Sequence, residues 1–194
     1  MSTPPVQSGR RSSPNSMPHT WFSSHLVFLD ETSVTTNMAR THGRSPVGER
    51  VVGAIPQAHW KTTTFVAALR LNGMTAPLVI DGAMTGAVFL AYVEQQLAPS
   101  LSPGDFVVMD NVAMHRVAGV EQAITARGAT IRRLPPYSPD MNPIELAFAK
   151  LKAMLRKAAA RSIRNLWRRI AHIIRHFLPQ ECRNYFAHDG YVCS

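Results

Sequence analysis

Three carboxylates in this 194-residue chain stand where an apolar run ends or a helix begins. Asp30 closes the run "VFLD", Asp110 closes "VVMD", and Glu145 ends "NPIE". A carboxylate at the end of a buried strand needs a compensating cation or solvent. If the two strands are parallel neighbours, both aspartates reach one edge of the sheet, where their repulsion favours a bound divalent cation. Oxygen-only ligands suit Mg²⁺ or Mn²⁺, although either aspartate could instead be a strand end that faces water.

The loop before Glu145 is rich in proline, with four prolines between residues 135 and 143. Local rules explain Glu145 without any chemistry, because Asn142 is a typical N-cap, Pro143 suits the first turn, and a glutamate at the third position reaches back to the cap. Those rules do not explain the rigid loop. A strand at 129–134 that runs beside the second apolar strand would let this loop hold Glu145 near the sheet edge. A helix cap and a third metal ligand therefore both remain open for Glu145.

Apolar runs along the chain predict the strands that must position these acids. They lie at 25–31, at 62–82, where a hairpin turns at Asn72-Gly73, and at 104–110 and 129–136. Helical patterns alternate with them, and this order is typical of a mixed α/β sheet with helices packed on its faces.

Apolar residues at helical spacing predict helices at 86–97 and 115–128. After Pro143 the pattern stays helical for nearly forty residues, and two amphipathic helices are expected there. Ser162 is the expected N-cap of the second helix, and Pro179 is its expected end.

The net charge of +9 is unevenly distributed. Residues 1–145 contain 11 basic and 10 acidic side chains, whereas residues 146–194 contain 10 basic and 2 acidic ones. A basic helical C-terminal segment of this kind suggests a polyanionic partner, most often nucleic acid, and a solvated helix face is the alternative. Five basic side chains at its start are candidate phosphate contacts: Lys150, Lys152, Arg156, Lys157 and Arg161.

The N-terminus and the cysteines indicate a cytosolic protein. Residues 1–24 are rich in Ser, Pro and Arg, lack the apolar core of a secretory signal, and are expected to form a disordered leader. No apolar stretch approaches the roughly 20 residues needed to span a membrane. Cys182 and Cys193 lack metal-ligand spacing and are expected to be reduced thiols.

The acids and their surroundings resemble the catalytic triad, two aspartates and a glutamate, of the DDE transposases of the mariner superfamily. The nearer likeness is to the bacterial insertion-sequence branch. The motifs are "FLDE", "MDNVAMH" and "PPYSPDMNPIE", with 34 residues between Asp110 and Glu145. The likeness continues through "GRSPVGERV", "HWKTTTFVAALRLNGMTAPLVIDG", "FLAYVEQQLAP" and "LAFAKLKAMLRKAAAR" to "ECRNYFAHDGY", and so covers roughly residues 25–191.

This resemblance implies a ribonuclease-H-like fold and phosphoryl transfer with two Mg²⁺ ions, for which Mn²⁺ would substitute. Asp30 and Asp110 would bridge and hold the ions, and Glu145 would complete the second site. The implied reactions are hydrolysis of DNA at transposon ends and transfer of the freed 3′-OH into target DNA. Asn111 and His115 match the family's Asp-Asn and His pattern. They would support the ligands or face DNA, and a structural helix start is the alternative for His115.

Glu31 follows Asp30 on the first strand. Because successive strand side chains point to opposite faces, Glu31 is not expected to take part in the site.

The expected organisation is a disordered leader (1–24), a catalytic domain (25–160) and a basic helical extension packed on the same domain (161–194). Full-length relatives carry helix-turn-helix segments before the catalytic domain, and no recognition helix is visible here. The chain is therefore expected to be a catalytic half that acts as a homodimer on DNA, together with a separate N-terminal half, in the cytoplasm and nucleoid of a bacterium.

Three other functions remain open at this stage. The chain could be a nuclease that cuts without joining, or a fragment or remnant that binds DNA without complete transposition activity. It could also be a structural protein in which the three acids lie far apart.

Overall fold

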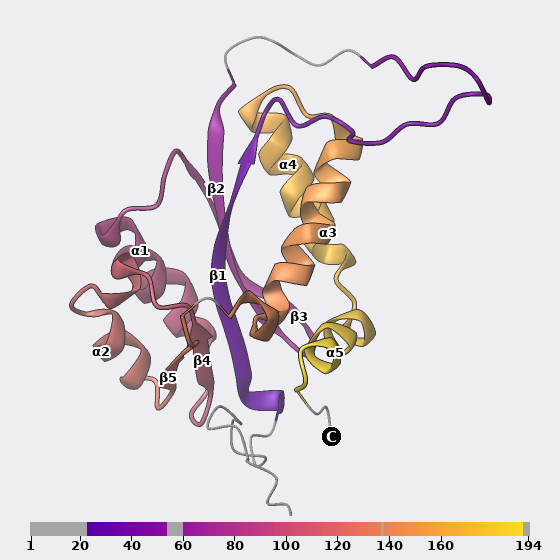
Figure 1. The fold of residues 1–194 in the computed structure, drawn as a ribbon. Helices are drawn as coiled ribbons and strands as arrows, with labels where there is room; N and C mark the ends of the chain where they lie inside the picture. The colour runs from indigo at the N-terminus through magenta and orange to yellow at the C-terminus, as the bar shows by residue number, and fades with distance from the viewer. Residues whose placement is uncertain (1–22, 54–59, 137, 192–194) are drawn as a thin grey trace, which may run out of the picture.

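A computed structural model of the chain describes residues 23–53, 60–136 and 138–191. At its centre is a five-stranded sheet with the order β3-β2-β1-β4-β5 (Figure 1). The strands are β1 (Leu26–Thr35), β2 (Thr62–Arg70), β3 (Gly73–Asp81), β4 (Phe106–Met109) and β5 (Thr130–Arg133). β2 is antiparallel to β1 and β3, whereas β4 is parallel to β1 and β5. The mixed sheet and the hairpin expected from the sequence are confirmed.

Helices cover both faces of this sheet (Figure 1). One side carries α1 (Gly86–Tyr92), extended by a π-helical turn η2 (Val93–Leu97), and α2 (Val120–Thr125). The other side carries α3 (Pro143–Ala158), α4 (Ile163–Ile173) and α5 (Pro179–His188). The remaining turns are 3₁₀ helices: η1 (Ser23–His25), η3 (Ala98–Ser100), η4 (Ala113–Arg116), η5 (Pro139–Met141) and η6 (Ile174–His176).

Successive side chains of β1 point to opposite faces of the sheet and are buried in two separate cores. Phe28 is buried in the core that α3, α4 and α5 share, and Leu29 is buried in the core beneath α1 and α2. Burying a side chain of this size stabilises the fold by about 1.5–3 kcal/mol. The alternation continues, because Asp30 contacts the residue before α3 and Glu31 contacts η4 on the other side.

α3 and α4 form as the amphipathic pattern predicts. Ile144, Phe148, Leu151 and Leu155 make a buried stripe along α3. The Ser162 side chain caps α4 by accepting a hydrogen bond from the backbone N–H of the third helical residue at 3.4 Å, as expected.

Two helix boundaries differ from the sequence prediction. α2 begins at Val120 rather than at residue 115, because Gly119 adopts a left-handed φ of 100° and separates it from η4. His115 consequently lies in a 3₁₀ turn. The helix expected to end at Pro179 ends earlier, at Ile173, and Pro179 instead occupies the first turn of α5, where its missing N–H is not needed.

The C-terminal helix α5 packs into the same core as α3 and α4. Phe186 is fully buried, with its ring centroid 5.2 Å from that of Phe28 in an edge-to-face arrangement. The Tyr191 hydroxyl donates to the carbonyl oxygen of Met141 at 2.8 Å, next to the start of α3. Tyr191, which follows α5, therefore supports the proline-rich loop.

The expected boundaries of the leader and of the C-terminal extension remain predictions. Residues 1–22 of the expected leader lie outside the described residues, and Ser23 already belongs to η1. The division at residue 160 is likewise still an expectation. Among the described residues, no helix is long and apolar enough to span a membrane.

Candidate active site

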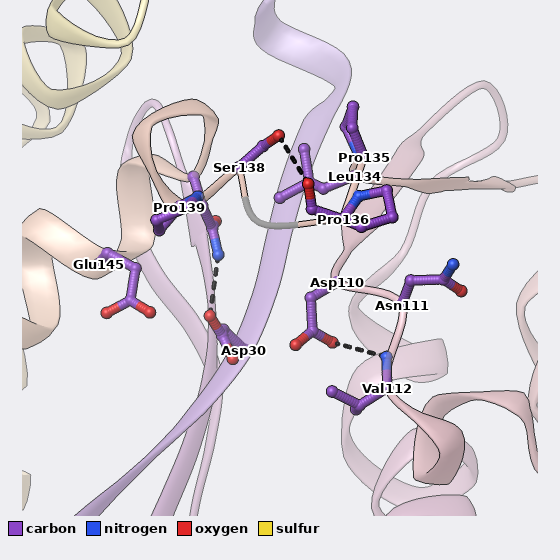
Figure 2. A pocket seen from close by; sticks show the side chains of 11 residues that line it. Asp30, Asp110, Asn111, Val112, Leu134, Pro135, Pro136, Ser138, Pro139 and Glu145 are labelled. Carbon is purple, nitrogen blue, oxygen red and sulfur yellow. Dashed lines mark hydrogen bonds between the residues drawn. The ribbon is translucent and has the colours of Figure 1, made fainter.

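Asp30, Asp110 and Glu145 line one pocket of about 440 Å³ (Figure 2). Its wall is completed by the loop between β5 and α3, including Leu134, Pro135, Pro136, Ser138, Pro139 and Asn142. The three acids come from β1, from the residue after β4, and from the first turn of α3.

Asp30 is not at the end of its strand. The parallel pairing with β4 stops at Phe28, but β1 continues to Thr35 because its second half pairs with β2. The side chain is only 8% exposed, so the expectation of a strand end facing water is wrong for this residue. Oδ1 accepts the backbone N–H of Glu31 at 2.8 Å, and Oδ2 accepts a hydrogen bond from Asn142 Nδ2 at 2.8 Å.

The position of Asp30 disfavours the charged form of its carboxyl group. Burial chiefly, and then repulsion from Glu31, Glu145 and Asp110, raise its pKa from 3.8 to about 7, against the lowering effect of the Glu31 N–H. A bound divalent cation would relieve both contributions, and without one a substantial fraction of this acid is protonated at neutral pH.

Asp110 has the opposite environment. Its Oδ1 lies 2.6 Å from Nδ1 of His115 and 3.5 Å from the Val112 nitrogen. The contact with His115 chiefly, together with the Val112 N–H and the charge of Arg133, lowers the pKa of Asp110 despite partial burial. The carboxylate is therefore ionised at neutral pH.

His115 also touches an acid that sequence reasoning set aside. Its Nε2 lies 3.1 Å from Oε2 of Glu31. The ring is fully buried, which alone would lower its pKa, but contacts with Asp110 and Glu31 outweigh burial and raise the pKa to about 9. Glu31 does point away from Asp30, as strand alternation requires. The sequence carried no signal that η4 would bring a histidine to that face.

Asn142 corrects another expectation. It immediately precedes α3, but its side chain does not cap the helix. The amide nitrogen instead donates to Asp30, and the buried Oδ1 has no hydrogen-bond partner among the described residues. Asp30 attracts this amide because a buried carboxylate needs hydrogen-bond donors.

Glu145 is exposed and extends into the pocket from the first turn of α3 (Figure 2). Its backbone N–H donates to the Asn142 carbonyl at 3.0 Å. No described hydrogen bond joins its carboxylate to the cap residue. Glu145 is thus available to a ligand.

The donor set fits a hard divalent cation, because it consists of carboxylate oxygens and one buried amide oxygen without a partner in the described part of the chain. Among the same residues, however, no group of three or more His, Cys, Asp or Glu side chains stands close enough to hold one ion. The three acids share the pocket, but their side chains are not gathered around one point in it.

The other residues predicted for the site are Asn111 and the five basic residues of the C-terminal segment. Asn111 lines the pocket, and its Oδ1 accepts two hydrogen bonds from Arg116. Lys150 pairs with Glu181 of α5, and Arg161 donates to the carbonyl oxygens of Thr36 and Met38. Both of these cations therefore hold the fold together, whatever else they contact.

The other basic candidates also belong to α3, where Lys152 and Arg156 are half-buried and Lys157 is exposed. Arg156 and Lys157 line a second pocket of about 390 Å³ together with Arg40 and His42. This basic pocket (Arg40, Thr41, His42, Ala153, Arg156 and Lys157) joins α3 to a segment far away in the sequence.

Comparison with known proteins agrees with the geometry of the site. A family model described as DDE superfamily endonuclease matches residues 25–167, which include all three acids. The chain belongs to this family. None of the curated proteins compared matches the chain.

Several solved structures share the fold of this DDE endonuclease domain. The Mos1 strand transfer complex has a TM-score of 0.59 at 15% identity, over 97% of this chain and 67% of that one. The Mos1 mariner paired end complex with Mg gives 0.53 at 17% identity, over 97% and 68%. The corresponding complex with Mn gives 0.50 at 15% identity, over 96% and 67%. At identities this low, the structural similarity shows a common fold and nothing more. It confirms the expected ribonuclease-H-like fold class.

Proposed function

We propose that this DDE endonuclease domain is the catalytic part of a transposase from the bacterial insertion-sequence branch of the mariner superfamily. It would hydrolyse DNA phosphodiesters at transposon ends and transfer the resulting 3′-OH into target DNA. The observation that carries this proposal is the common pocket of Asp30, Asp110 and Glu145, which three separate elements supply.

The three carboxylates would hold two Mg²⁺ ions, or Mn²⁺ in their place. Support comes from the oxygen-rich donor set and from the solved Mos1 complexes with Mg and with Mn, which share the fold. Divalent ions bound here supply the activation of a water or 3′-OH nucleophile and the stabilisation of the leaving oxygen.

The chain's own residues prepare this site. Asp110 is held ionised by His115, so one ligand is ready at neutral pH. Asp30 must lose a proton, and the Asn142 amide that donates to its Oδ2 favours the ionised form. Glu145 lies in the first turn of α3, and the proline-rich loop holds this turn in place relative to the sheet.

DNA would approach along the exposed face of α3. The basic pocket with Arg156 and Lys157 lies about 16 Å along the helix from Glu145, from the rise of 1.5 Å per residue. A phosphate backbone that extends from the active site can span this distance. We further propose that the active form is a homodimer, because two transposon ends must be joined, and that a helix-turn-helix half provides end recognition.

A nicking assay on supercoiled plasmid DNA tests the central proposal. The chain should nick the plasmid only when Mg²⁺ or Mn²⁺ is present, and Glu145→Gln should lose this activity by at least about a hundredfold while it still binds DNA. Glu121→Gln, an exposed change on α2, is the matched control. Equal nicking by Glu145→Gln and the unsubstituted chain would refute the assignment.

The second candidate is a fragment or remnant that binds DNA without complete transposition activity. The exposed basic residues of α3 and α4 favour it, since they need no catalysis. Salt-sensitive DNA binding without metal-dependent nicking would support this function. A nuclease that cuts without joining is recognised by the absence of joined products when pre-cleaved ends are supplied.

A further inference from the structure

We propose that Glu31 is a positioning residue of the active site, which acts through the buried His115 to hold the Asp110 carboxylate in place for metal binding. This inference rests on the proposed function and extends it to a residue on the opposite face of the sheet. The contact chain Glu31–His115–Asp110 starts beneath α1 and α2 and ends in the pocket on the α3 side.

The two contacts of the chain are short and use both ring nitrogens. Nε2 of His115 lies 3.1 Å from Glu31 Oε2, and Nδ1 lies 2.6 Å from Asp110 Oδ1. The N–H at Nδ1 is not aligned for a regular hydrogen bond, so the second contact is a close ion pair. The imidazole therefore has a carboxylate oxygen close to each of its two nitrogens.

The ring of His115 is enclosed by its neighbours. It is fully buried, and its centroid lies 4.4 Å from that of Phe89 in α1. The His115 carbonyl oxygen accepts a hydrogen bond from Arg133 of β5 at 3.3 Å, which fixes the backbone of η4. α1 and β5 therefore hold His115 in place, and β1 supplies Glu31 as the second carboxylate beside its ring.

This arrangement assigns separate tasks to the two oxygens of Asp110. Oδ1 is occupied by His115 and by the Val112 N–H, which leaves Oδ2 as the atom available to a cation. Partners that hold a ligand in this way are typically worth about ten- to a hundredfold in metal affinity.

Removal of the Glu31 charge would leave a buried N–H of His115 without a charged acceptor. The ring would then be held less from one side, and it would hold the Asp110 carboxylate less firmly. Glu31 is 19% exposed and lies outside the pocket, so it does not need to touch the cation to have this effect.

A purely structural role for Glu31 is the competing explanation, since the same contact also ties η4 to β1. That role predicts a lower melting temperature with unchanged metal affinity. The two effects are separable when Mn²⁺ binding to the whole chain is measured without DNA, by the loss of the free-ion electron paramagnetic resonance signal.

The experiment compares the unsubstituted chain with Glu31→Gln, which keeps the shape and removes the charge. We expect Glu31→Gln to bind Mn²⁺ about ten- to a hundredfold more weakly, and Glu121→Gln, an exposed change on α2, to bind normally. Should Glu31→Gln unfold, Glu31→Asp withdraws the carboxylate by one methylene and retains the charge, and it is expected to weaken binding too.

A double-mutant cycle with His115→Gln tests the route of the effect. If Glu31 acts through the ring, Glu31→Gln should have little further effect on Mn²⁺ affinity in the His115→Gln background. Full additivity would overturn the proposed route, and unchanged affinity in the folded Glu31→Gln variant would overturn the role itself.

Asp110→Asn separates this inference from the function on which it rests. If Mn²⁺ binding depends on Asp110 but not on Glu31, the metal site stands and only the positioning role fails. If Asp110→Asn binds Mn²⁺ as well as the unsubstituted chain does, or if that chain binds none, the proposed function fails and the positioning role fails with it.

Discussion

Replacement of Asp30 by asparagine is expected to stabilise the metal-free protein at neutral and alkaline pH. The buried carboxyl has a pKa of about 7 in the folded chain, against 3.8 as the ordinary value. Ionising this group therefore costs the folded state about 4 kcal/mol more than the unfolded state. The Asp30→Asn variant would keep the shape of the side chain without the charge, and the unpartnered Oδ1 of Asn142 offers an acceptor for the new amide.

The pH dependence has a definite sign. Below pH 3.8 the carboxyl is protonated in both states and the variant should gain little. Between pH 3.8 and 7 the unfolded chain loses its proton first, so the advantage of the asparagine should grow with pH. Above pH 7 both states are ionised, and the difference in the free energy of unfolding should level off near its maximum of about 4 kcal/mol.

Urea unfolding in EDTA at pH 5 and pH 8 measures this difference directly. Comparing the variant with the unsubstituted chain at each pH cancels the contributions of other titrating groups, provided that the neighbouring acids keep their environment. Lost hydrogen bonds to the carboxylate would reduce the gain by about 1 kcal/mol each. A variant no more stable than the unsubstituted chain at pH 8 would refute the reasoning that burial and repulsion dominate at Asp30.

Other contacts lead to further expectations. Asn142→Ala removes the amide that donates to Asp30 and should raise the pKa of that carboxyl. Calorimetric titration should therefore show that the variant binds Mn²⁺ more weakly than the unsubstituted chain at pH 7, with a smaller difference in affinity at pH 9. Replacing Arg156 and Lys157 together by Ala should reduce the slope of log affinity for duplex DNA against log salt by about 2, since each phosphate contact contributes about 0.9. Lys150→Ala should leave that slope unchanged in fluorescence anisotropy, because its ammonium already pairs with Glu181. In urea unfolding, Lys150→Ala and Glu181→Ala should each cost about 1 kcal/mol, with the double variant costing less than their sum.

The elements that carry the acids could be predicted because their signals are local. Apolar runs that end at Asp30 and Asp110 indicated two buried strands, and the structure pairs them as parallel neighbours. Asn142-Pro143 marked the start of α3 correctly. The ribonuclease-H-like sheet then followed from the order of the elements and from the family resemblance.

The features that the sequence could not reveal depend on contacts between distant segments. Asn142 was expected to cap α3, but Asp30 takes up its amide across 112 positions of the chain. His115 was placed in a helix because apolar spacing continues through it, although the left-handed Gly119 breaks that helix. Strand alternation predicted correctly that Glu31 points away from Asp30. It could not predict the contact with His115, because periodicity does not say which loop lies above a strand face.

The hydrogen bond from Tyr191 to Met141 links the last described residues of the chain to the loop that presents Glu145. Phe186 and Tyr191 also pack their rings against Phe28, two residues before Asp30. During synthesis these residues emerge from the ribosome after all three acids. The nascent polypeptide thus contains all three carboxylates before it contains the residues that support their positions, and nuclease activity should appear only after Tyr191 has been synthesised.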